Sequence, residues 1–347
     1  MRILVTGGCG FIGSHIVEYH LLKGDQVDVI DNLSTGSLNN LEHLKNNPNL
    51  HIEIADMLTS PMLEKMVTSC DRIYHMAAVL GIYRVIEKPL DVLDTNVLGT
   101  ERLLRLIAES NKKPRLILTS SSSAYGNSRK ALLKEKDTLI IASPSHPLWG
   151  YAISKIVNEA YALAYMKTHK LPITIIRPFN TIGPRQTGLY GMVVPRFVQQ
   201  ACNNEAITVF GSGKQTRSFC DVRDSVVALD MLASNDASIG EIVNIGLDKE
   251  ITINALAELV RKRANSTSEI IHVPYKKAYG WKYTDIKQRH PDISKLIKFT
   301  NFEHKWTLED TVDYLISTFR QSEKVAIKQL PQNDPVYHIS EVRSSRA

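Results

Sequence analysis

The sequence has little that would suit a disulfide-rich, metal-binding or membrane protein. Its four cysteines, Cys9, Cys70, Cys202 and Cys220, are widely spaced and form no C-x-x-C pair. Neither a disulfide framework nor a metal site is therefore expected. No apolar run reaches the roughly 20 residues that span a bilayer, so no membrane association is expected. The first residues lack the charged, apolar and small-residue regions of a signal peptide, which predicts a cytoplasmic protein.

The sequence also lacks a concentration of charge. Its 347 residues carry 42 basic and 36 acidic side chains, a net charge of +6. Basic pairs such as Lys112-Lys113 and Lys276-Lys277 are dispersed and are not interleaved with aromatic residues. A nucleic-acid-binding protein presents a basic stripe, so no nucleic-acid partner is expected. A modest positive field suits a small anionic substrate at least as well.

What the first half does contain is a regular alternation of short apolar runs and helical patterns. Segments with apolar residues at three- and four-residue spacing predict helices at 14–23, 61–69, 92–110 and 151–170. The apolar runs predict buried strands at 2–6, 26–30, 51–55, 72–76, 115–119 and 173–177. This alternation predicts an α/β fold with a Rossmann-type, doubly wound parallel sheet.

The pattern changes after Pro178, where loops rich in Gly, Pro, Asn and Arg begin. We expect residues 1–178 to form a dinucleotide-binding domain. Residues 179–321 are expected to form mainly a smaller, substrate-binding C-terminal domain, with a segment near 220–260 returning to the first domain. Residues 322–347 are polar and show no periodicity, which predicts a loosely held tail.

A glycine-rich turn joins the first expected strand to the first helix. Gly7, Gly10 and Gly13 leave this turn without Cβ atoms, so the backbone can approach a pyrophosphate placed at the helix N-terminus. Asp31 ends the second expected strand, where a carboxylate accepts hydrogen bonds from the adenosine ribose and repels a 2′-phosphate. No arginine adjoins Asp31. The sequence therefore predicts NAD, and not NADP, as the cofactor.

Other residues of this turn and of the following strand ends are expected at the cofactor. Asp56 follows the third strand, where its side chain can touch the adenine. Small residues after the fourth strand leave room for the cofactor, although packing alone also explains Ala77, Ala78 and Asn96. The further residues expected to bind the cofactor are Phe11, Ile12, Asn32, Asp56, Met57, Ala77, Ala78 and Asn96.

Three residues have the chemistry of an oxidation at a hydroxyl-bearing carbon. Tyr151 and Lys155 lie four residues apart on an expected helix and project from one face, beside the cofactor. An ammonium near a phenol lowers the phenol pKa from about 10 toward the range of a general base. Ser121 lies at the C-terminal end of a strand and can hold the oxygen that Tyr151 deprotonates. A surface pair and a strand-end cap are the alternatives, and the nucleotide-fold context favours catalysis.

These features together resemble the extended short-chain dehydrogenases/reductases of the nucleotide-sugar epimerase/dehydratase group. The resemblance spans roughly residues 1–315 and includes the glycine turn, Asp31, Asn96, the 120–126 stretch, the Tyr151/Lys155 pair and residues 177–185. It implies an NAD retained through turnover, a nucleoside-diphosphate sugar, above all a UDP-sugar, and oxidation at sugar C4 as the first step. It also implies a homodimer formed by helices 92–110 and 151–170.

The resemblance assigns further residues to the substrate. Asn180 and Arg217 match residues that contact the nucleotide diphosphate, and Arg217 lies in a matching Arg-Ser-Phe-Cys-Asp-Val-Arg-Asp stretch. Arg289 lies in an Arg-His-Pro-Asp sequence that matches the C-terminal motif of the group and is assigned to the substrate on that match alone. Arg177 is expected to be structural.

The two residues after Ser121 help to choose among the reactions of the group. In its 4,6-dehydratases an Asp-Glu pair removes water, whereas this chain has Ser122 and Ser123, whose neutral hydroxyls transfer protons poorly at neutral pH. Its UDP-glucuronate decarboxylases carry Glu at the position of Ser123. Decarboxylation stays an alternative, because a 4-keto uronate is a β-keto acid that loses CO2 with its own carbonyl as electron sink. The expected reaction is 4-epimerisation, in which the 4-keto sugar rotates before hydride returns from the cofactor.

The sugar is left open between two classes. Ser122 and Ser123 can donate to a C6 carboxylate and Arg185 can pair with one, which would make UDP-glucuronate or UDP-galacturonate the substrate. The alternatives are UDP-glucose/galactose and a UDP-N-acetylhexosamine. Two other functions are alternatives, an NAD-sensing or scaffold protein and a reductase that exchanges free NAD(P). The first is disfavoured because the chain keeps both Tyr151 and Lys155, and tightly retained NAD would argue against the second.

Overall fold

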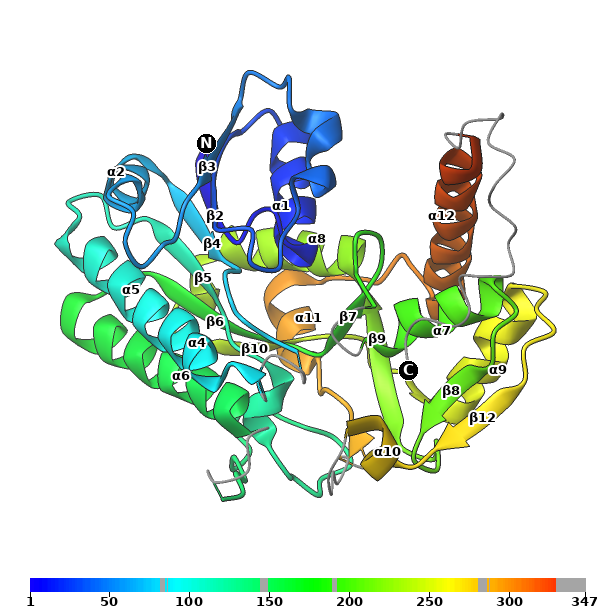
Figure 1. Cartoon of the computed structure of the whole chain (residues 1–347). Coiled ribbons are helices and arrows are strands. Elements are labelled where there is room, and N and C mark those ends of the chain that lie inside the picture. The colour runs from blue at the N-terminus through cyan, green and yellow to red at the C-terminus, as the bar shows by residue number, and fades with distance from the viewer. Residues whose placement is uncertain are drawn as a thin grey trace.

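The computed structural model describes residues 1–81, 85, 87–143, 149–188, 192–279, 286 and 288–328, with no side-chain description for 322–328. A large parallel sheet with helices on both faces lies beside a smaller part built from short strands and helices (Figure 1). None of the helices in these described ranges has the length and apolar character needed to cross a bilayer.

The large sheet has seven parallel strands in the order β10-β6-β5-β4-β1-β2-β3. Strand order reverses between β1 and β4, which leaves a crevice at their C-terminal ends where doubly wound folds bind nucleotides. The six predicted strands are confirmed to within one residue at each end. The strands are β1 (Arg2–Thr6), β2 (Gln26–Asp31), β3 (Leu50–Ile54), β4 (Arg72–His75), β5 (Arg115–Thr119), β6 (Ile173–Pro178) and β10 (Ile242–Ile245).

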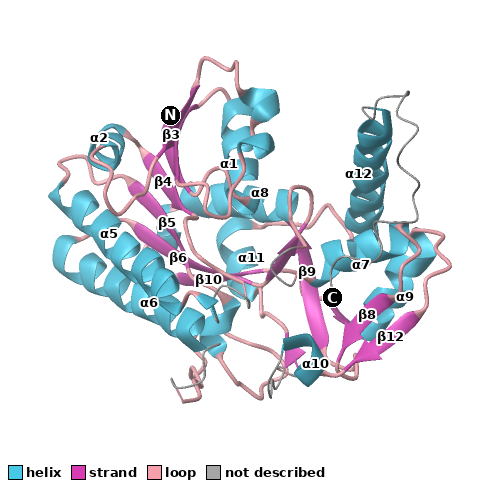
Figure 2. Cartoon of the chain, viewed as in Figure 1, coloured by secondary structure: helices cyan, strands magenta, loops and turns pink. Residues whose placement is uncertain are grey.

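Alternate residues of the strands face two separate cores, because successive strand side chains point to opposite faces. Ile3 and Val5 belong to one core with α1 (Phe11–Leu22), α8 (Val222–Ala233) and α11 (Ser294–Thr300). Leu4 belongs to the other core, which the second group of helices covers (Figure 2). That group comprises α2 (Met62–Ser69), α4 (Pro89–Leu93), the π-helical turn η3 (Asp94–Leu98), α5 (Gly99–Glu109) and α6 (Trp149–His169).

The smaller part packs around a third core. One of its sheets has the order β11-β9-β13 with β7 also paired to β9, and the other pairs β12 with β8. Its strands are β7 (Asn180–Ile182), β8 (Ile207–Phe210), β9 (Thr216–Asp221), β11 (Glu250–Thr252), β12 (Ile270–Val273) and β13 (Gln288–Arg289). Its helices are α7 (Val193–Cys202), α9 (Ile253–Arg263), α10 (Tyr275–Tyr279) and α12 (Leu308–Lys328).

Two expectations about boundaries differ from the structure. The chain returns to the large sheet through α8 and β10, whereas β11 and α9, which fall in the expected 220–260 segment, belong to the smaller part. Helix α12 continues to Lys328, past the expected tail boundary at residue 322, because its preceding turns are anchored by Val312, Leu315 and Ile316 in the third core. Residues 329–347 of the expected tail lie outside the described residues.

Candidate active site

A cavity of about 950 Å³ runs along the C-terminal edge of the large sheet and is closed on its other side by the smaller part. Every residue predicted for the cofactor or substrate lines it, with the single exception of Asn96. The large sheet and the loops and helices that follow its strands contribute Gly7, Gly10, Phe11, Ile12, Gly13, Asp31, Asn32, Asp56, Met57, Ala77, Ala78, Ser121, Ser122, Ser123, Tyr151 and Lys155. From the chain after β6 come Asn180, Arg185, Arg217 and Arg289.

The glycine turn is packed so tightly that side chains are excluded at two positions. Gly7 has φ +70°, and a Cβ there would lie 2.7 Å from the backbone nitrogen of Ala77. A Cβ on Gly13 would lie 2.1 Å from the carbonyl oxygen of Gly7. Gly10 is the N-cap residue of α1 and makes no side-chain cap. The turn therefore presents bare backbone and a helix N-terminus to the cavity, which suits a pyrophosphate.

Asp31 is held in position by the turn that it faces. Its carboxylate accepts hydrogen bonds from the backbone N–H of Cys9 at 2.9 Å and of Leu33 at 2.8 Å. Burial raises the pKa of Asp31, against the opposite effect of these two bonds. Asn32 donates to the Asp56 carboxylate at 3.3 Å. The residues predicted for the ribose and the adenine thus share one end of the cavity, and the cradle fits an NAD.

Asn96 has another place in the structure. It is fully buried, and its side-chain oxygen accepts from Val79 N–H at 2.8 Å while its amide donates to the Val79 carbonyl at 3.1 Å. The same amide donates to Ser154 Oγ at 3.1 Å. Asn96 therefore fixes the segment after β4 and the start of α6, and it does not itself line the cavity.

The three predicted catalytic residues come together at the other end of the cavity. Lys155 is 1% exposed, donates from Nζ to the Thr119 carbonyl at 2.9 Å, and lies 5.9 Å from the Tyr151 ring centroid. Burial lowers the pKa of Lys155 to about 8, and the Glu159 charge acts in the opposite direction. Burial raises the pKa of Tyr151, while a hydrogen bond with Ser121 and the charge of Arg289 favour the phenolate.

The serine run forms a short 3-10 helix, η4 (Ser122–Tyr125), that Ser121 caps. Ser121 Oγ accepts from Ser123 N–H at 3.1 Å, so its own proton is left to donate to Tyr151 or to a substrate oxygen. Ser122 is 4% exposed, and Ser123 is half-buried. The cap thus gives Ser121 a fixed direction at the cavity wall.

The residues assigned to the substrate are held mainly by backbone carbonyls. Asn180 donates to the Ser218 carbonyl at 2.8 Å, and Arg217 donates to the carbonyls of Thr216 at 2.7 Å and Ile286 at 2.8 Å. Both of these partners are neutral carbonyl groups. Arg289 lies beside Arg217 in the register of β13 and β9. These two arginines present a concentrated positive charge that suits a diphosphate.

Arg185 lines the cavity and is also attached to α1. Its Nη2 forms an ion pair with Glu18 on α1 and lies 3.3 Å from His43 Nε2, so its charge is already countered by a residue of the large domain. Its Nη1 is buried without a hydrogen-bond partner among the described residues. Arg185 thus anchors its loop to α1 and also lines the cavity, and its pairing with a substrate carboxylate stays a prediction.

The charged residues of the described lining are mostly basic. Within the described lining, the acidic residues are Asp31 and Asp56, both at the adenosine end. The basic ones are Lys155, Arg185, Arg196, Arg217 and Arg289. Sequence reasoning missed Arg196, whose guanidinium lies 3.9 Å from the Phe210 ring centroid. No sequence motif marks that pair, because α7 and β8 bring it together only in the fold.

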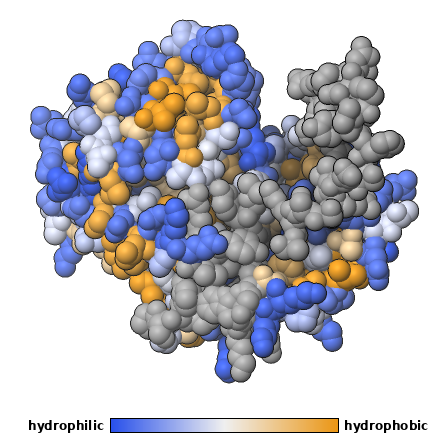
Figure 3. All heavy atoms as spheres, in the orientation of Figure 1, coloured by the Kyte–Doolittle hydropathy of each residue, from blue (hydrophilic) through white to orange (hydrophobic). Residues whose placement is uncertain are grey.

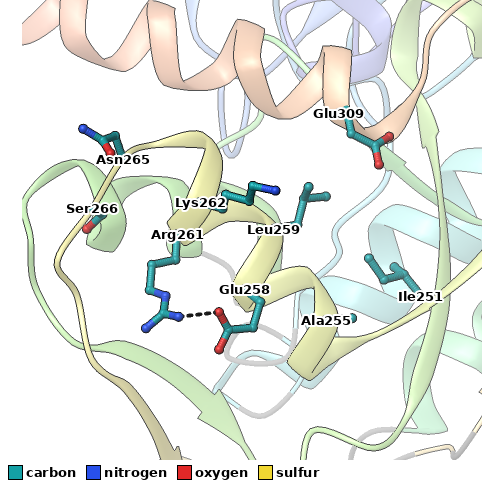
Figure 4. A pocket seen from close by; sticks show the side chains of 9 residues that line it. All are labelled: Ile251, Ala255, Glu258, Leu259, Arg261, Lys262, Asn265, Ser266 and Glu309. Atoms are coloured by element: carbon teal, nitrogen blue, oxygen red, sulfur yellow. Dashed lines mark hydrogen bonds and ion pairs between the residues drawn. The ribbon is translucent and has the colours of Figure 1, made fainter.

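A second hollow, of about 620 Å³, lies in the smaller part between α9 and the start of α12 (Figure 4). Glu258 and Arg261 form an ion pair of 2.6 Å on its wall. Its other lining residues, Ile251, Ala255, Leu259, Lys262, Asn265, Ser266 and Glu309, include none of the predicted site residues. The predicted chemistry is thus confined to the larger cavity.

Comparison with known proteins gives relatives along almost the whole chain. The profile of the NAD dependent epimerase/dehydratase family matches residues 3–246. The chain is 36% identical to the UDP-N-acetyl-alpha-D-glucosaminuronate decarboxylase of Bacillus cytotoxicus, over 93% of this chain and 98% of that protein. It is 35% identical to UDP-glucuronic acid decarboxylase 1 of Arabidopsis thaliana, over 92% of this chain and 70% of that protein.

Solved structures are similar over the same extent. A UDP-N-acetylglucosamine 4-epimerase from Methanobrevibacter ruminantium M1 superimposes with a TM-score of 0.83 at 30% identity, covering 92% of this chain and 98% of the other. The UDP-glucuronic acid 4-epimerase of Bacillus cereus, solved with UDP-glucuronic acid and NAD, gives 0.82 at 26% identity, covering 93% and 100%. With its glycine turn, Asp31 and Tyr151/Lys155 pair along one cavity, the chain belongs to the NAD-dependent epimerase/dehydratase family, with NAD as its cofactor.

Proposed function

We propose that this protein is an NAD-dependent 4-epimerase of a UDP-linked hexuronic acid. The observation that carries the proposal is the arrangement of Ser121, Tyr151 and Lys155 at the basic end of the cavity, where the described lining holds no carboxylate. This set performs oxidation and reduction at a hydroxyl-bearing carbon, and it lacks a group for a subsequent acid-catalysed elimination.

Tyr151 acts as the general base on the C4 hydroxyl. Its phenolate is stabilised by the Lys155 ammonium and by the Ser121 hydroxyl, which also orients the substrate oxygen. The bound NAD supplies a hydride acceptor that can return the hydride to C4. After the keto sugar has rotated, Tyr151 gives its proton back to the C4 oxygen as hydride returns to the other face of C4, which inverts the configuration at C4. Arg217 and Arg289 retain the diphosphate, so the keto sugar can rotate without leaving.

The neutral residues after Ser121 favour epimerisation over dehydration. In the dehydratases of this group, the positions of Ser122 and Ser123 carry an acid and a base. A serine hydroxyl cannot replace either at neutral pH. Their hydroxyls instead suit a C6 carboxylate, which accepts hydrogen bonds without needing a proton. Three of the four proteins named above support the uronic acid, since the two decarboxylases and the Bacillus cereus epimerase carry a UDP-linked uronic acid in their names. The Methanobrevibacter ruminantium epimerase is named for UDP-N-acetylglucosamine.

Decarboxylation is the second candidate, and a specific observation favours it. The two curated relatives compared above, at 36% and 35% identity, are both decarboxylases of UDP-linked uronic acids. Oxidation at C4 makes the substrate a β-keto acid, so loss of CO2 needs no further catalytic carboxylate. The two functions share Ser121, Tyr151 and Lys155 and differ only in the fate of the 4-keto intermediate.

Incubation of the purified protein with UDP-glucuronate, without added NAD, separates these functions. Nuclear magnetic resonance and mass spectrometry would show UDP-galacturonate at unchanged mass for the epimerase, or a product lighter by CO2 for the decarboxylase. Parallel reactions with UDP-N-acetylglucosaminuronate, UDP-glucose and UDP-N-acetylglucosamine test the sugar. Clear preference for a neutral sugar would overturn the uronic acid assignment. Retained NAD without turnover of any of these sugars would favour an NAD-sensing protein.

A further inference from the structure

We propose that Glu159 and Ser120 are positioning residues that clamp the strand end carrying Ser121 to the helix carrying Tyr151 and Lys155. The inference rests on the proposed oxidation at C4 and deepens it, because it names residues outside the catalytic set that fix its geometry. Ser120 lies in the cavity wall beside Ser121, but its hydroxyl bonds to Glu159, which does not line the described part of the cavity. Both side chains therefore act through their neighbours.

The clamp is a buried, charge-assisted network. Ser120 Oγ donates to Glu159 Oε1 at 2.5 Å. Arg177 donates from Nε to Oε1 at 2.8 Å and from Nη2 to Oε2 at 2.7 Å, closing a bidentate ion pair. The exposures of Ser120, Glu159 and Arg177 are 2%, 4% and 2%. Arg177 thus has the structural role expected from the sequence, and its partners are residues that sequence reasoning missed.

The chain spacing explains why this network controls the active site. Tyr151, Lys155 and Glu159 lie at four-residue intervals on α6 and therefore face the same way. Lys155 bonds to Thr119 and Glu159 bonds to Ser120, while Tyr151 shares a hydrogen bond with Ser121. The bonds of Lys155 and Glu159 therefore fix the position of α6 relative to the end of β5. That position sets the distance between the hydroxyls of Tyr151 and Ser121.

The ion pair between Glu159 and Arg177 fixes the orientation of the Glu159 carboxylate more than it stabilises the fold. Replacing a buried ion pair by apolar residues of similar volume is often neutral for stability, whereas a bidentate pair fixes orientation. Arg177 is itself held by the Glu135 carbonyl at 3.2 Å and lies 4.7 Å from the Tyr125 ring centroid. The clamp therefore also reaches η4, whose N-cap is Ser121.

The charge of Glu159 also faces the catalytic lysine. Glu159 raises the pKa of Lys155 against the effect of burial. The other groups near this site are His75, whose pKa burial lowers to about 3, the Arg177 guanidinium paired with Glu159, and Arg289, which acts on Tyr151. Glu159 is thus the carboxylate that favours the charged form of Lys155, alongside its mechanical role.

Ser120→Ala tests the mechanical role, because it removes one hydrogen bond and leaves the Glu159–Arg177 pair and every charge in place. We expect kcat with UDP-glucuronate to fall about 10-fold with KM unchanged, since a small misplacement of reacting groups costs rate more than binding. Ser238→Ala is the matched control, because Ser238 is also buried and accepts from Arg115 at 2.7 Å. A kcat for Ser120→Ala equal to that of Ser238→Ala would overturn the mechanical role.

Glu159→Gln tests the electrostatic role. We expect kcat to fall more than in Ser120→Ala, and the alkaline limb of the pH profile, where Lys155 loses its proton, to move to lower pH. Asp230→Asn is the matched control, because Asp230 forms a buried pair with Arg72 at 2.6 Å at the other end of the sheet. It leaves an unpaired arginine and should lower stability without moving the pH profile. Identical pH profiles in Glu159→Gln and Asp230→Asn would contradict the electrostatic role.

A readout that needs no turnover separates failure of this inference from failure of the proposed function. The holoenzyme is labelled with 13C at lysine Cε, and the resonance that disappears in Lys155→Met is assigned to Lys155. The chemical shift of that resonance, followed over pH, gives the pKa of Lys155. We expect that pKa to be lower in Glu159→Gln and unchanged in Asp230→Asn. Inactivity of the wild type toward all UDP-sugars would overturn the proposed function alone. An unchanged Lys155 titration in Glu159→Gln would overturn the inference, whatever the substrate.

Discussion

Tyr151 has the one side chain in the described cavity lining that combines an acidic hydroxyl with a neighbouring ammonium, at 5.9 Å from its ring centroid. Its environment opposes ionisation by burial and favours it through Ser121 and Arg289. A positive charge near the ring also favours the phenolate, so we expect Tyr151 to release and recover its proton most readily while Lys155 is charged. At the scale of single residues, the reaction therefore depends on groups whose charge is set by their surroundings.

Removing the phenol hydroxyl should abolish the proton transfer and leave the fold intact. We expect Tyr151→Phe to lower kcat by about 10²–10⁴-fold, the usual contribution of a positioned acid or base. Tyr161→Phe, on the exposed side of the same helix, is the control and should keep wild-type activity. Steady-state rates measured by product chromatography check this. Near-normal turnover by Tyr151→Phe would require another base.

Asp31 should decide between the two dinucleotides. We expect Asp31→Asn to weaken NAD binding by about 10-fold, since a hydrogen bond to a charged group contributes about 1.5–3 kcal/mol. The same change should raise the affinity for NADP relative to the affinity for NAD, because no carboxylate then repels the 2′-phosphate. Calorimetric titration of the cofactor-stripped protein with each dinucleotide measures both. The exposed Asp248→Asn serves as control, and an unchanged preference in Asp31→Asn would show that Asp31 does not contact the ribose.

At the scale of elements, the loop between β7 and α7 is attached to α1 at two points. His15 Nε2 lies 3.0 Å from the Pro184 carbonyl, and Arg185, at φ +67°, pairs with Glu18. The loop and the N-terminus of α1 line the same cavity. These contacts join the smaller part of the molecule to the helix whose N-terminus we propose as the site of the cofactor phosphates.

Loosening this attachment should release NAD faster. We expect Glu18→Gln to raise the NAD dissociation rate about 3- to 10-fold, consistent with a partly buried ion pair worth about 1 kcal/mol. Release is followed by trapping the free dinucleotide with an NAD-consuming enzyme. Glu42→Gln removes a carboxylate from the neighbouring 3-10 helix η2 (Glu42–Leu44), which pairs with Lys45 in solvent. Equal release rates in the two variants would contradict the role of the loop.

Acid should weaken the fold through a histidine that joins three elements. His75 on β4 bonds through Nδ1 to Thr6 Oγ1 at 2.7 Å on β1 and through Nε2 to Thr100 Oγ1 at 3.0 Å on α5. Burial lowers the pKa of His75 to about 3 and that of His15 to about 4. Both values lie below that of an unfolded histidine, so the unfolded state binds more protons as the pH falls.

The stabilisation from neutral His75 is fully present above about pH 6.5 and is lost progressively toward pH 3, at a cost of about 3–5 kcal/mol. Urea unfolding at pH 7 and pH 5 should show a smaller difference in unfolding free energy for His75→Gln than for wild type. The exposed His169→Gln should keep the wild-type difference. If His75→Gln loses as much unfolding free energy between pH 7 and pH 5 as the wild type, His75 is not the cause of the acid sensitivity.

At the scale of the whole molecule, apolar side chains remain exposed on the face formed by α4, η3 and α6, seen at the lower left of Figure 3. Leu90 is 70% exposed, Leu98 is 53% exposed and Leu163 is 43% exposed. Exposed apolar patches of this kind mark interaction surfaces. The helices that the resemblance implies at a two-fold axis, 92–110 and 151–170, include η3 and α6.

We expect a dimer of the 38.9 kDa chain in solution, held through this face. Leu98→Glu should shift sedimentation equilibrium toward the monomer, because it would place two symmetric charges in an apolar contact. Leu22→Glu, at an 81% exposed position on α1, should leave the oligomeric state unchanged. A monomeric wild type, or a Leu98→Glu variant that stays dimeric, would contradict the assignment of this face.

The sequence by itself determined the sheet, the glycine turn and which residues meet at the proposed catalytic site. These follow from local causes: strand runs such as 115–119 are continuous and apolar, Gly7 and Gly13 stand where no Cβ fits, and Tyr151 and Lys155 share a helix face. The short strand β9 and the helix α8 were not predicted, because β9 is stabilised by pairing with strands distant in the chain. Only the tertiary structure joined Glu159 to Ser120 and Arg185 to Glu18, since no local pattern records which side chains meet across 39 or 167 residues.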